Sequence, residues 1–207
     1  VSLLAEHGLP FHVDRPLIGM ISRMADQKGF DLISEAFEAI LALQVQVIIL
    51  GSGDEKYHKL FADIGKRYPD QVIVKITYDN SLAHKIEAGA DIFLMPSRYE
   101  PCGLNQLYSL RYGTLPVVRN TGGLEDSIID YFADPEKGTG YKFYSYSSAE
   151  MLKVLTKVVI LYKNRAEWEK IMIRAMSQDF SWETSAKQYI ELYSRSLSRK
   201  RTDFEKF

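Results

Sequence analysis

The sequence predicts an α/β fold built on a doubly wound, parallel sheet of about six strands. Short apolar runs begin near residues 17, 45, 72, 92 and 115, and a helical stretch separates each run from the next. This alternation is typical of βαβ units, whose crossovers are right-handed. The run at 92–95 is apolar without interruption, as expected for a strand that is buried on both faces. Loops after the strands are polar or rich in glycine, so we expect them to gather at one edge of the sheet.

The elements follow in order from the apolar periodicity. A first helix near residues 1–8 is ended by Gly8 and Pro10. Strands are expected at 17–21, 45–50, 72–76, 92–95 and 115–118, with a short sixth at 140–144. Helices are expected at 30–43, around 57–64, at 82–88, around 104–111 and at 124–131. After residue 147 the pattern is helical only, and its three apolar stripes, at 151–162, 168–176 and 182–193, are interpreted as core packing.

We interpret residues 1–207 as one Rossmann-like domain without repeats or a dividing linker. Residues 1–146 would form the α/β sheet part and 147–195 a helical part. The charged segment 196–207 is expected to be a frayed or solvated tail. The chain begins with Val1 instead of Met, which indicates a processed chain or a piece of a longer protein.

Composition excludes several classes of partner. Hydrophobic residues make up 46% of the chain and charged residues 26%, an ordinary balance for a soluble globular protein. Lys and Arg total 26 against 27 for Asp and Glu, so no net charge attracts nucleic acid or a membrane surface. A single cysteine excludes an internal disulfide, and no apolar run reaches the roughly 18 residues of a membrane helix. We therefore expect a cytoplasmic protein that binds neither nucleic acid nor membrane.

Two cations and a glycine-rich turn follow the first two expected strands. Arg23 and Lys28 lie in a loop that ends at Gly29, directly before a helix. Charge-assisted hydrogen bonds and the helix dipole suit such a place to a diphosphate, although two exposed surface cations would give the same pattern. Gly51 opens a Gly-Ser-Gly turn that would let the backbone approach a ligand. The third small residue of the dinucleotide fingerprint is missing, because Lys56 occupies its position.

The loop after the fourth strand carries a carboxylate. Glu100 follows Pro96, which ends the strand because proline has no N–H to donate, and precedes a helix that starts near Leu104. Ligands of open parallel sheets bind at the carboxyl ends of strands, where helix N-termini present free N–H groups. Glu100 is thus a candidate acceptor for a polar ligand such as a sugar, the alternative being a solvated loop carboxylate. Cys102 is interpreted as a small packed thiol instead of a nucleophile.

Two further loops belong to the same edge. Gly122 and Gly123 offer bare amides at a helix start, which suit phosphate. Tyr78, in a polar loop after the third strand, would stack on a nucleobase or be an ordinary half-buried tyrosine, and the sequence does not separate the two. The four histidines show no metal-binding spacing, and neither a Walker A loop nor a Gly-x-Ser-x-Gly elbow is present, so we expect no metal or cofactor.

Three segments carry a resemblance to a known family. They read ISRMADQKGFDLI at 21–33, PSRYEPCGLNQ at 96–106 and TGGL at 121–124, and FSW at 180–182 agrees with them. In this order they resemble bacterial and archaeal glycogen synthases and plant starch synthases, which are retaining glucosyltransferases of the GT-B fold. The chain resembles only the C-terminal of the two Rossmann-like domains of that fold, the one with most of the nucleotide-sugar donor site.

The resemblance implies a role for each candidate residue. Arg23 and Lys28 would hold the donor diphosphate and neutralise its growing charge, the work that a metal does elsewhere. Glu100 would bind the glucose hydroxyls, and Tyr78 would lie against the base. The other implied donor-binding residues are Gly51, Cys102, Gly103, Leu104, Thr121, Gly122 and Gly123. The implied reaction moves glucose from ADP-glucose or UDP-glucose to the 4-hydroxyl of an α-1,4-glucan, with retention and without a metal.

The chain departs from the wider group in two ways. Retaining GT-B enzymes commonly carry a second glutamate eight residues after the first, whereas Tyr108 stands here, as in glycogen synthases of this type. The N-terminal domain, with its glycine-rich donor loop and catalytic-site histidine, is absent, so we expect the chain alone to bind nucleotide weakly and to catalyse no transfer. Two alternatives stay open: another retaining GT-B transferase, such as a sucrose or trehalose-type synthase, and a non-enzymatic nucleotide- or glycan-binding module. A dehydrogenase is disfavoured by the missing fingerprint.

Overall fold

The computed structural model describes the backbone of residues 2–204 and the side-chain burial of residues 2–198. The chain forms two compact units, Val1–Ser177 and Gln178–Phe207. The boundary between them falls inside the segment 147–195 that the sequence analysis treats as one helical part. Among the described residues, no helix is both long enough and apolar enough to cross a membrane.

The first unit contains the parallel sheet that the sequence predicts, and the α/β fold class is confirmed. Its six strands are β1 (Leu17–Ile21), β2 (Gln46–Gly51), β3 (Val72–Ile76), β4 (Ile92–Met95), β5 (Leu115–Arg119) and β6 (Tyr141–Phe143). Their order in the sheet is β3-β2-β1-β4-β5-β6, and all neighbours are parallel. The order reverses between β1 and β4, so the chain crosses from one half of the sheet to the other there. Ligands of doubly wound sheets bind in the crevice at this switch point.

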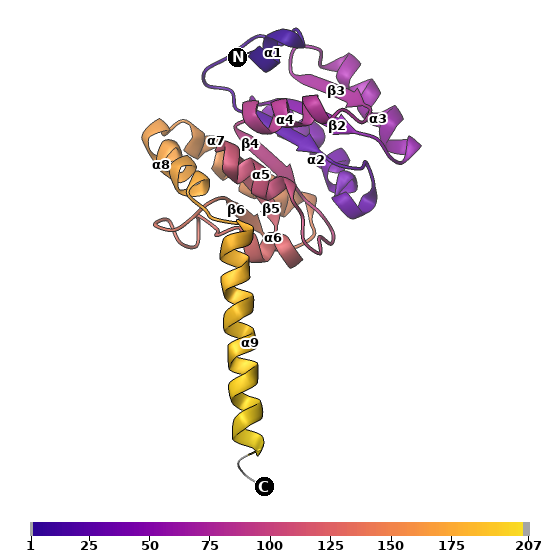
Figure 1. Cartoon of the computed structure of the whole chain (residues 1–207). Helices are drawn as coiled ribbons and strands as arrows, with labels where there is room; N and C mark the ends of the chain where they lie inside the picture. The colour runs from indigo at the N-terminus through magenta and orange to yellow at the C-terminus, as the bar shows by residue number, and fades with distance from the viewer. Residues whose placement is uncertain (1, 205–207) are drawn as a thin grey trace. The chain divides into compact units, whose positions relative to one another are not determined.

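Helices cover both faces of the sheet (Figure 1). They are α1 (Ser2–Glu6), the 3₁₀ turn η1 (Asp26–Lys28), α2 (Phe30–Ala42), α3 (Glu55–Arg67), α4 (Asn80–Gly89), α5 (Asn105–Tyr112), α6 (Gly122–Ser127), α7 (Ser148–Tyr162) and α8 (Arg165–Met176). One buried cluster joins α2, α3 and α7 through side chains such as Phe37, Phe61 and Val158. A second, smaller cluster joins α1 and α4 through Leu3 and Ile86. Because apolar layers lie against both faces, the central strands are apolar throughout instead of alternating.

The predicted helix at 124–131 is wrong in its extent, since α6 ends at Ser127. The residues after it extend and pair with a later segment instead. The amides of Thr139 and Gly140 both donate to the carbonyl of Ile129, and Asp130 forms an isolated parallel bridge with Gly140. This pairing joins residues about ten positions apart and leaves no periodic pattern in the sequence. The short apolar run alone therefore predicts a helix.

The second unit is built around α9 (Trp182–Phe204). The apolar stripe on this helix was predicted to be core, and this is wrong for the described chain: Trp182 is 88% exposed and Ile190 64% exposed. A stripe needs a second surface to bury it, and this unit supplies no further helix or strand among its described residues. The helix also continues through most of the predicted tail, to Phe204, while 205–207 lie outside the described residues.

Candidate functional site

Two cavities adjoin at the carboxyl ends of the central strands. The first, of about 450 Å³, lies beyond β1, β2 and β3 and is lined by residues that include Arg23, Gly51 and Tyr78. The second, of about 290 Å³, lies beyond β1 and β4 and is lined by residues that include Lys28 and Glu100. Both cavities share the residues Ile21, Ser22, Arg23 and Asn105. A ligand with two parts could therefore occupy both, with its middle beside Arg23.

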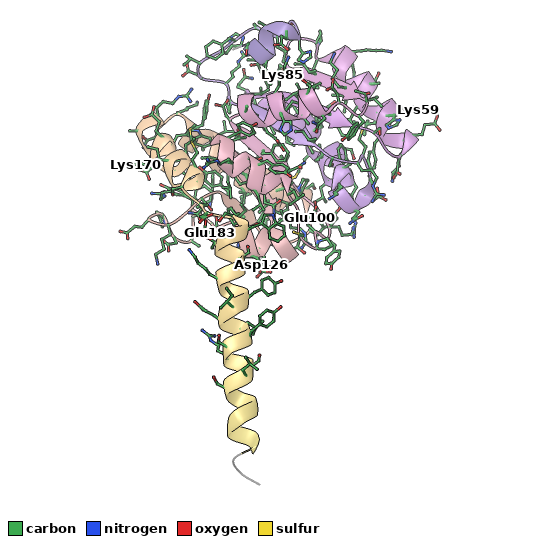
Figure 2. The ribbon with its side chains drawn as sticks, in the orientation of Figure 1. Lys59, Lys85, Glu100, Asp126, Lys170 and Glu183 are labelled. Atoms are coloured by element: carbon green, nitrogen blue, oxygen red, sulfur yellow. The ribbon has the colours of Figure 1, made fainter. Side chains whose placement is uncertain are left out.

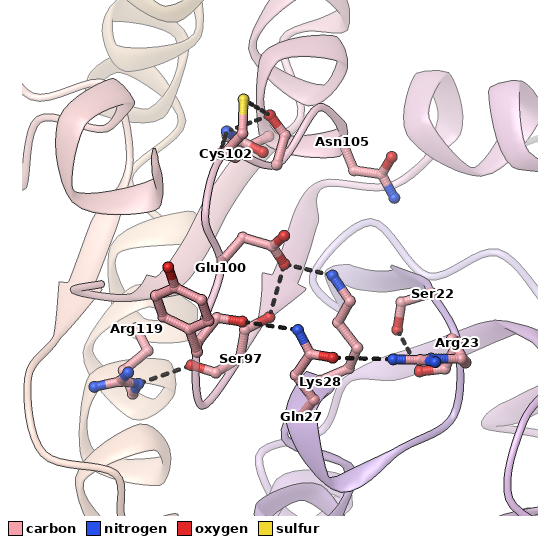
Figure 3. A network of polar contacts seen from close by, with 12 residues as sticks. Ser22, Arg23, Gln27, Lys28, Ser97, Glu100, Cys102, Asn105 and Arg119 are labelled. Atoms are coloured by element: carbon pink, nitrogen blue, oxygen red, sulfur yellow. Dashed lines mark hydrogen bonds and ion pairs between the residues drawn. The ribbon is translucent and has the colours of Figure 1, made fainter. Parts of the chain in front are cut away.

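The second cavity contains a partly buried ion pair. Lys28 Nζ lies 2.5 Å from Glu100 Oε2, and the hydroxyl of Ser97 donates to the same oxygen at 3.2 Å. Glu100 is only 6% exposed, so these partners replace the water that would otherwise surround its carboxylate. Both contacts use Oε2, which leaves Oε1 available to accept a hydrogen bond from a ligand hydroxyl. Figure 3 shows Glu100 between Ser97 and Lys28, and Figure 2 contrasts it with Lys59 and Lys170, which extend from the surface.

Arg23 is oriented by a neighbouring amide. Its Nη2 donates to Gln27 Oε1 at 2.9 Å, and Gln27 Nε2 donates in turn to the carbonyl of Tyr99 at 3.4 Å (Figure 3). This side-chain amide thus links the loop after β1 to the loop after β4. Arg23 itself is exposed and lines both cavities, so its guanidinium has free donors at their junction. A planar guanidinium in this position suits a phosphate group that spans the junction.

The start of α5 adds backbone donors to the second cavity. Its N-cap is Leu104, which has no side-chain oxygen and makes no capping hydrogen bond. Gly103, Leu104 and Asn105 all line the cavity, so the uncapped amides of the first turn lie at its wall. Together with Arg23 and Lys28, these amides and the helix dipole create a positive environment for an anion.

The predicted ligand-approach glycines mainly bring loops together. A Cβ on Gly51 would lie 1.9 Å from the carbonyl oxygen of Ser22, and one on Gly123 would lie 1.9 Å from that of Cys102. A Cβ on Gly122 would lie 2.2 Å from the carbonyl oxygen of Glu100. The amide of Gly123 also donates to that carbonyl at 3.0 Å, so it is not the free phosphate donor that the sequence suggested. These glycines are required where one loop backbone touches the next.

The remaining predicted residues separate into two groups. Tyr78 lines the first cavity and is 88% exposed, so its ring is free to be covered by a ligand. Thr121, Gly122, Gly123 and Cys102 line neither cavity. The prediction of a packed thiol at Cys102 is wrong, because the residue is exposed. It is the backbone of Cys102, not its sulfur, that packs against Gly123.

Asn105 is a site residue that the sequence analysis did not single out. Its Nδ2 donates to the carbonyl of Ile21 at 2.8 Å, which ties the first turn of α5 to the end of β1. It lines both cavities. Its position at a predicted helix start after a predicted site loop was the available signal. Among the described residues, no group of three His, Cys, Asp or Glu side chains is arranged to hold a metal ion.

Comparison with known proteins agrees with this geometry. Residues 6–174 match the family described as glycosyl transferases group 1. The chain belongs to this family. Curated relatives include the glycogen synthase of Koribacter versatilis, 50% identical over 194 residues, and that of Thermosipho africanus, 50% identical over 200 residues. These alignments cover 94% and 96% of the chain but only 40% and 41% of the relatives, so the chain spans less than half the length of either.

Solved structures of glycosyl transferases give the same result for the fold. The catalytic domain of starch synthase IV from Arabidopsis thaliana, bound to ADP and acarbose, superimposes with a TM-score of 0.86 at 36% identity, covering 95% of the chain and 42% of that structure. The C-terminal domain of the group 1 protein LpcC from Francisella tularensis has a TM-score of 0.64 at 19% identity and shows the fold alone, covering 84% of the chain and 88% of that domain. The predicted resemblance and the C-terminal GT-B domain are confirmed.

Proposed function

We propose that this chain is the donor-binding domain of a glycogen synthase. The whole protein would transfer glucose from ADP-glucose to the non-reducing end of an α-1,4-glucan, with retention of configuration. The observation that carries the proposal is the second cavity, where the buried Glu100 carboxylate lies 2.5 Å from Lys28 at the switch point of the sheet. A sugar needs a hydrogen-bond acceptor and a diphosphate needs cations, and both stand here side by side. The identity to glycogen synthases, and the ADP in the starch synthase structure, support this choice of donor.

The two cavities divide the donor between them in this proposal. The base would lie in the first cavity against Tyr78, and the glucose in the second against Glu100. The diphosphate would span the junction at Arg23. When the bond between the anomeric carbon and the diphosphate oxygen breaks, both electrons would go to the diphosphate. The acceptor hydroxyl oxygen would form the new bond to the anomeric carbon, and its proton would pass to the leaving diphosphate oxygen. Arg23, Lys28 and the α5 amides would stabilise the negative charge that develops on the leaving group, without a metal.

The residues that line the second cavity argue against a reaction that uses two carboxylates. Of the residues that line the second cavity in the described part of the chain, Glu100 alone is acidic. Tyr108, at the position of the second glutamate in the wider group, lines neither cavity. The role of Glu100 would therefore be to bind and orient the sugar. The acceptor-binding site and the rest of the donor site would come from the part of the protein outside this chain, so the chain alone would transfer no glucose.

The proposal is tested by following labelled glucose in the whole protein that carries this chain. The protein would be incubated with a maltooligosaccharide and either ADP-glucose or UDP-glucose, with EDTA present. Elongation from ADP-glucose in EDTA is the expected result. Elongation from UDP-glucose alone would change the donor but keep the reaction. If neither donor supported elongation, the proposal would be overturned and a binding module would be favoured. Elongation by the isolated chain would overturn the claim that the chain alone is inactive.

A further inference from the structure

The segment that carries Glu100 is held by its backbone carbonyls. We call residues 97–103, between β4 and α5, the Glu100 loop. All of its carbonyls except that of Pro101 accept a hydrogen bond. The donors are Arg119 for Ser97 and Arg98, Gln27 for Tyr99, the Gly123 amide for Glu100, and Gln106 for Cys102 and Gly103. A loop held at so many points has little freedom, which preorganises the carboxylate that it carries.

Arg119 holds the first part of this loop. It is the last residue of β5, so its backbone is fixed in the sheet. Its Nε donates to the carbonyl of Ser97 at 2.7 Å (Figure 3), and its Nη2 donates to the carbonyl of Arg98. A planar guanidinium reaches two adjacent acceptors with two nitrogens held in a fixed geometry, which the single, rotating ammonium of a lysine does not provide. Arg119 lines neither cavity, so it has no direct contact to offer a ligand there.

The hydrogen bonds connect Arg119 to the carboxylate through Ser97. Ser97, whose carbonyl accepts from Arg119, uses its hydroxyl to donate to Glu100 Oε2 at 3.2 Å. Ser97 is buried, so water cannot easily replace either bond. The guanidinium therefore fixes the residue that orients Glu100.

A tyrosine supports the same loop and lies beside Arg119, whose guanidinium is 5.7 Å from the centre of the Tyr146 ring. The guanidinium of Arg98 lies 4.0 Å from the centre of the Tyr146 ring and pairs with Asp31 at 3.1 Å. The hydroxyl of Tyr146 donates to Asp31 Oδ1 at 2.5 Å. Burial and this hydrogen bond raise the pKa of Tyr146 to about 12, so the hydroxyl remains a donor at neutral pH. The side chain of Arg98 is thus fixed against α2, while its carbonyl is fixed by Arg119.

We propose that Arg119 is a positioning residue for glucose transfer, which acts by holding Ser97 and through it the Glu100 carboxylate. This inference rests on the proposed function. A positioning role predicts that loss of Arg119 lowers turnover but not the affinity for the diphosphate, whereas loss of a residue that merely stabilises the fold would lower both. The Glu100 loop should be displaced without Arg119, whereas Arg23 and Lys28, which belong to the loop after β1, should keep their affinity for the diphosphate.

The test compares three variants of the whole protein. Arg119→Met removes both donors at similar length, Arg119→Lys keeps the charge, and Arg111→Met changes an exposed arginine of α5 as the matched control. We expect kcat to fall roughly tenfold to a hundredfold in Arg119→Met, the cost of a small misplacement of a reacting group. Inhibition by ADP should change less than about twofold. Arg119→Lys should show a smaller fall in kcat than Arg119→Met, and Arg111→Met should have the kcat of wild type.

Amide hydrogen exchange gives a second readout that needs no activity. Exchange in Arg119→Met should become faster at residues 97–103 and stay unchanged in β1 and the loop after it. If wild type transfers no glucose, the proposed function fails, and exchange alone still decides whether Arg119 holds the loop. Unchanged kcat, unchanged exchange, or an equal loss of kcat and ADP affinity would each overturn the inference. If Arg119→Met does not fold, Arg119→Lys carries the same comparison.

Discussion

The two cavities differ in how firmly their walls are held. In the second, Glu100 is buried, paired with Lys28, and carried by a loop whose carbonyls are bound to neighbouring elements. In the first, Tyr78 is 88% exposed and lies on the loop between β3 and α4. The sugar end of the proposed donor site is thus built before a ligand arrives, and the base end is open.

This difference matches what each end would have to do. A group that orients a reacting sugar must hold its geometry, because misplacement costs rate directly. A ring that stacks on a base needs only a free face, since stacking tolerates changes of position. Selectivity for the base would then depend on contacts that form only when the ligand binds. Four substitutions test the comparison, in order of expected effect.

Replacement of the buried carboxylate should have the largest effect. In the whole protein, Glu100→Gln should lower turnover by about 100-fold or more, the usual scale for one preorganised polar group. ADP affinity should be unchanged or slightly higher, because Lys28 is released from its ion pair. Glu125→Gln, an exposed carboxylate on α6, is the matched control. An equal loss of turnover and ADP affinity would contradict the placement of Glu100 at the sugar end of the donor site.

The tight packing under the Glu100 loop can be broken at a glycine. Gly123→Ala would place a Cβ 1.9 Å from the carbonyl oxygen of Cys102, so we expect a loss of about 2–3 kcal/mol in the free energy of unfolding, as for overpacking. Gly65→Ala, within α3, is the control, since its Cβ would meet the Val74 side chain at an ordinary 3.5 Å. That change should stabilise by roughly 0.5–1 kcal/mol. Denaturant unfolding measures both, and equal stabilities would contradict the packing argument.

Arg23 tests the junction between the cavities. Arg23→Ala should weaken ADP binding by about 2 kcal/mol, or roughly 30-fold, the loss of a hydrogen bond to a charged group. Lys59→Ala, which removes an exposed cation of α3, should leave binding unchanged. Titration calorimetry with ADP distinguishes the two. Equal affinities in all three proteins would make Arg23 a surface cation.

The open end should show the smallest effect. Tyr78→Ala should weaken ADP binding by about 1 kcal/mol, the scale of a single aromatic contact. Tyr78→Phe keeps the ring and should bind ADP as wild type does. If the phenylalanine variant lost as much affinity as the alanine variant, the hydroxyl and not the ring face would be the contact.

Local patterns predicted the strands and placed the site loops well. The boundaries of β1, β3 and β4 agree with the apolar runs, and parallel topology brings Arg23, Lys28 and Glu100 to one edge as expected. The contacts of Arg119 with the Glu100 loop were not predictable. They join residues more than twenty positions apart, and an arginine at a strand end gives no sign of which carbonyls it will reach.

The errors have the same origin. The amide of Gly123 was expected to be free for a phosphate, because the sequence cannot show that the carbonyl of Glu100 already accepts a hydrogen bond from it. Likewise, the apolar stripe of α9 has the periodicity of a core helix, but periodicity does not say whether this chain contains the surface that would cover it.

The most direct test of the central claim is titration of ADP and ADP-glucose into the whole protein, its Glu100→Gln variant and its Arg23→Ala variant, without metal. The account predicts that Glu100→Gln reduces the affinity for ADP-glucose relative to ADP, and that Arg23→Ala weakens both ligands alike. If Glu100→Gln weakened ADP as much as ADP-glucose, or if NAD bound and neither of these ligands did, the assignment of the two cavities to sugar and nucleotide would be contradicted.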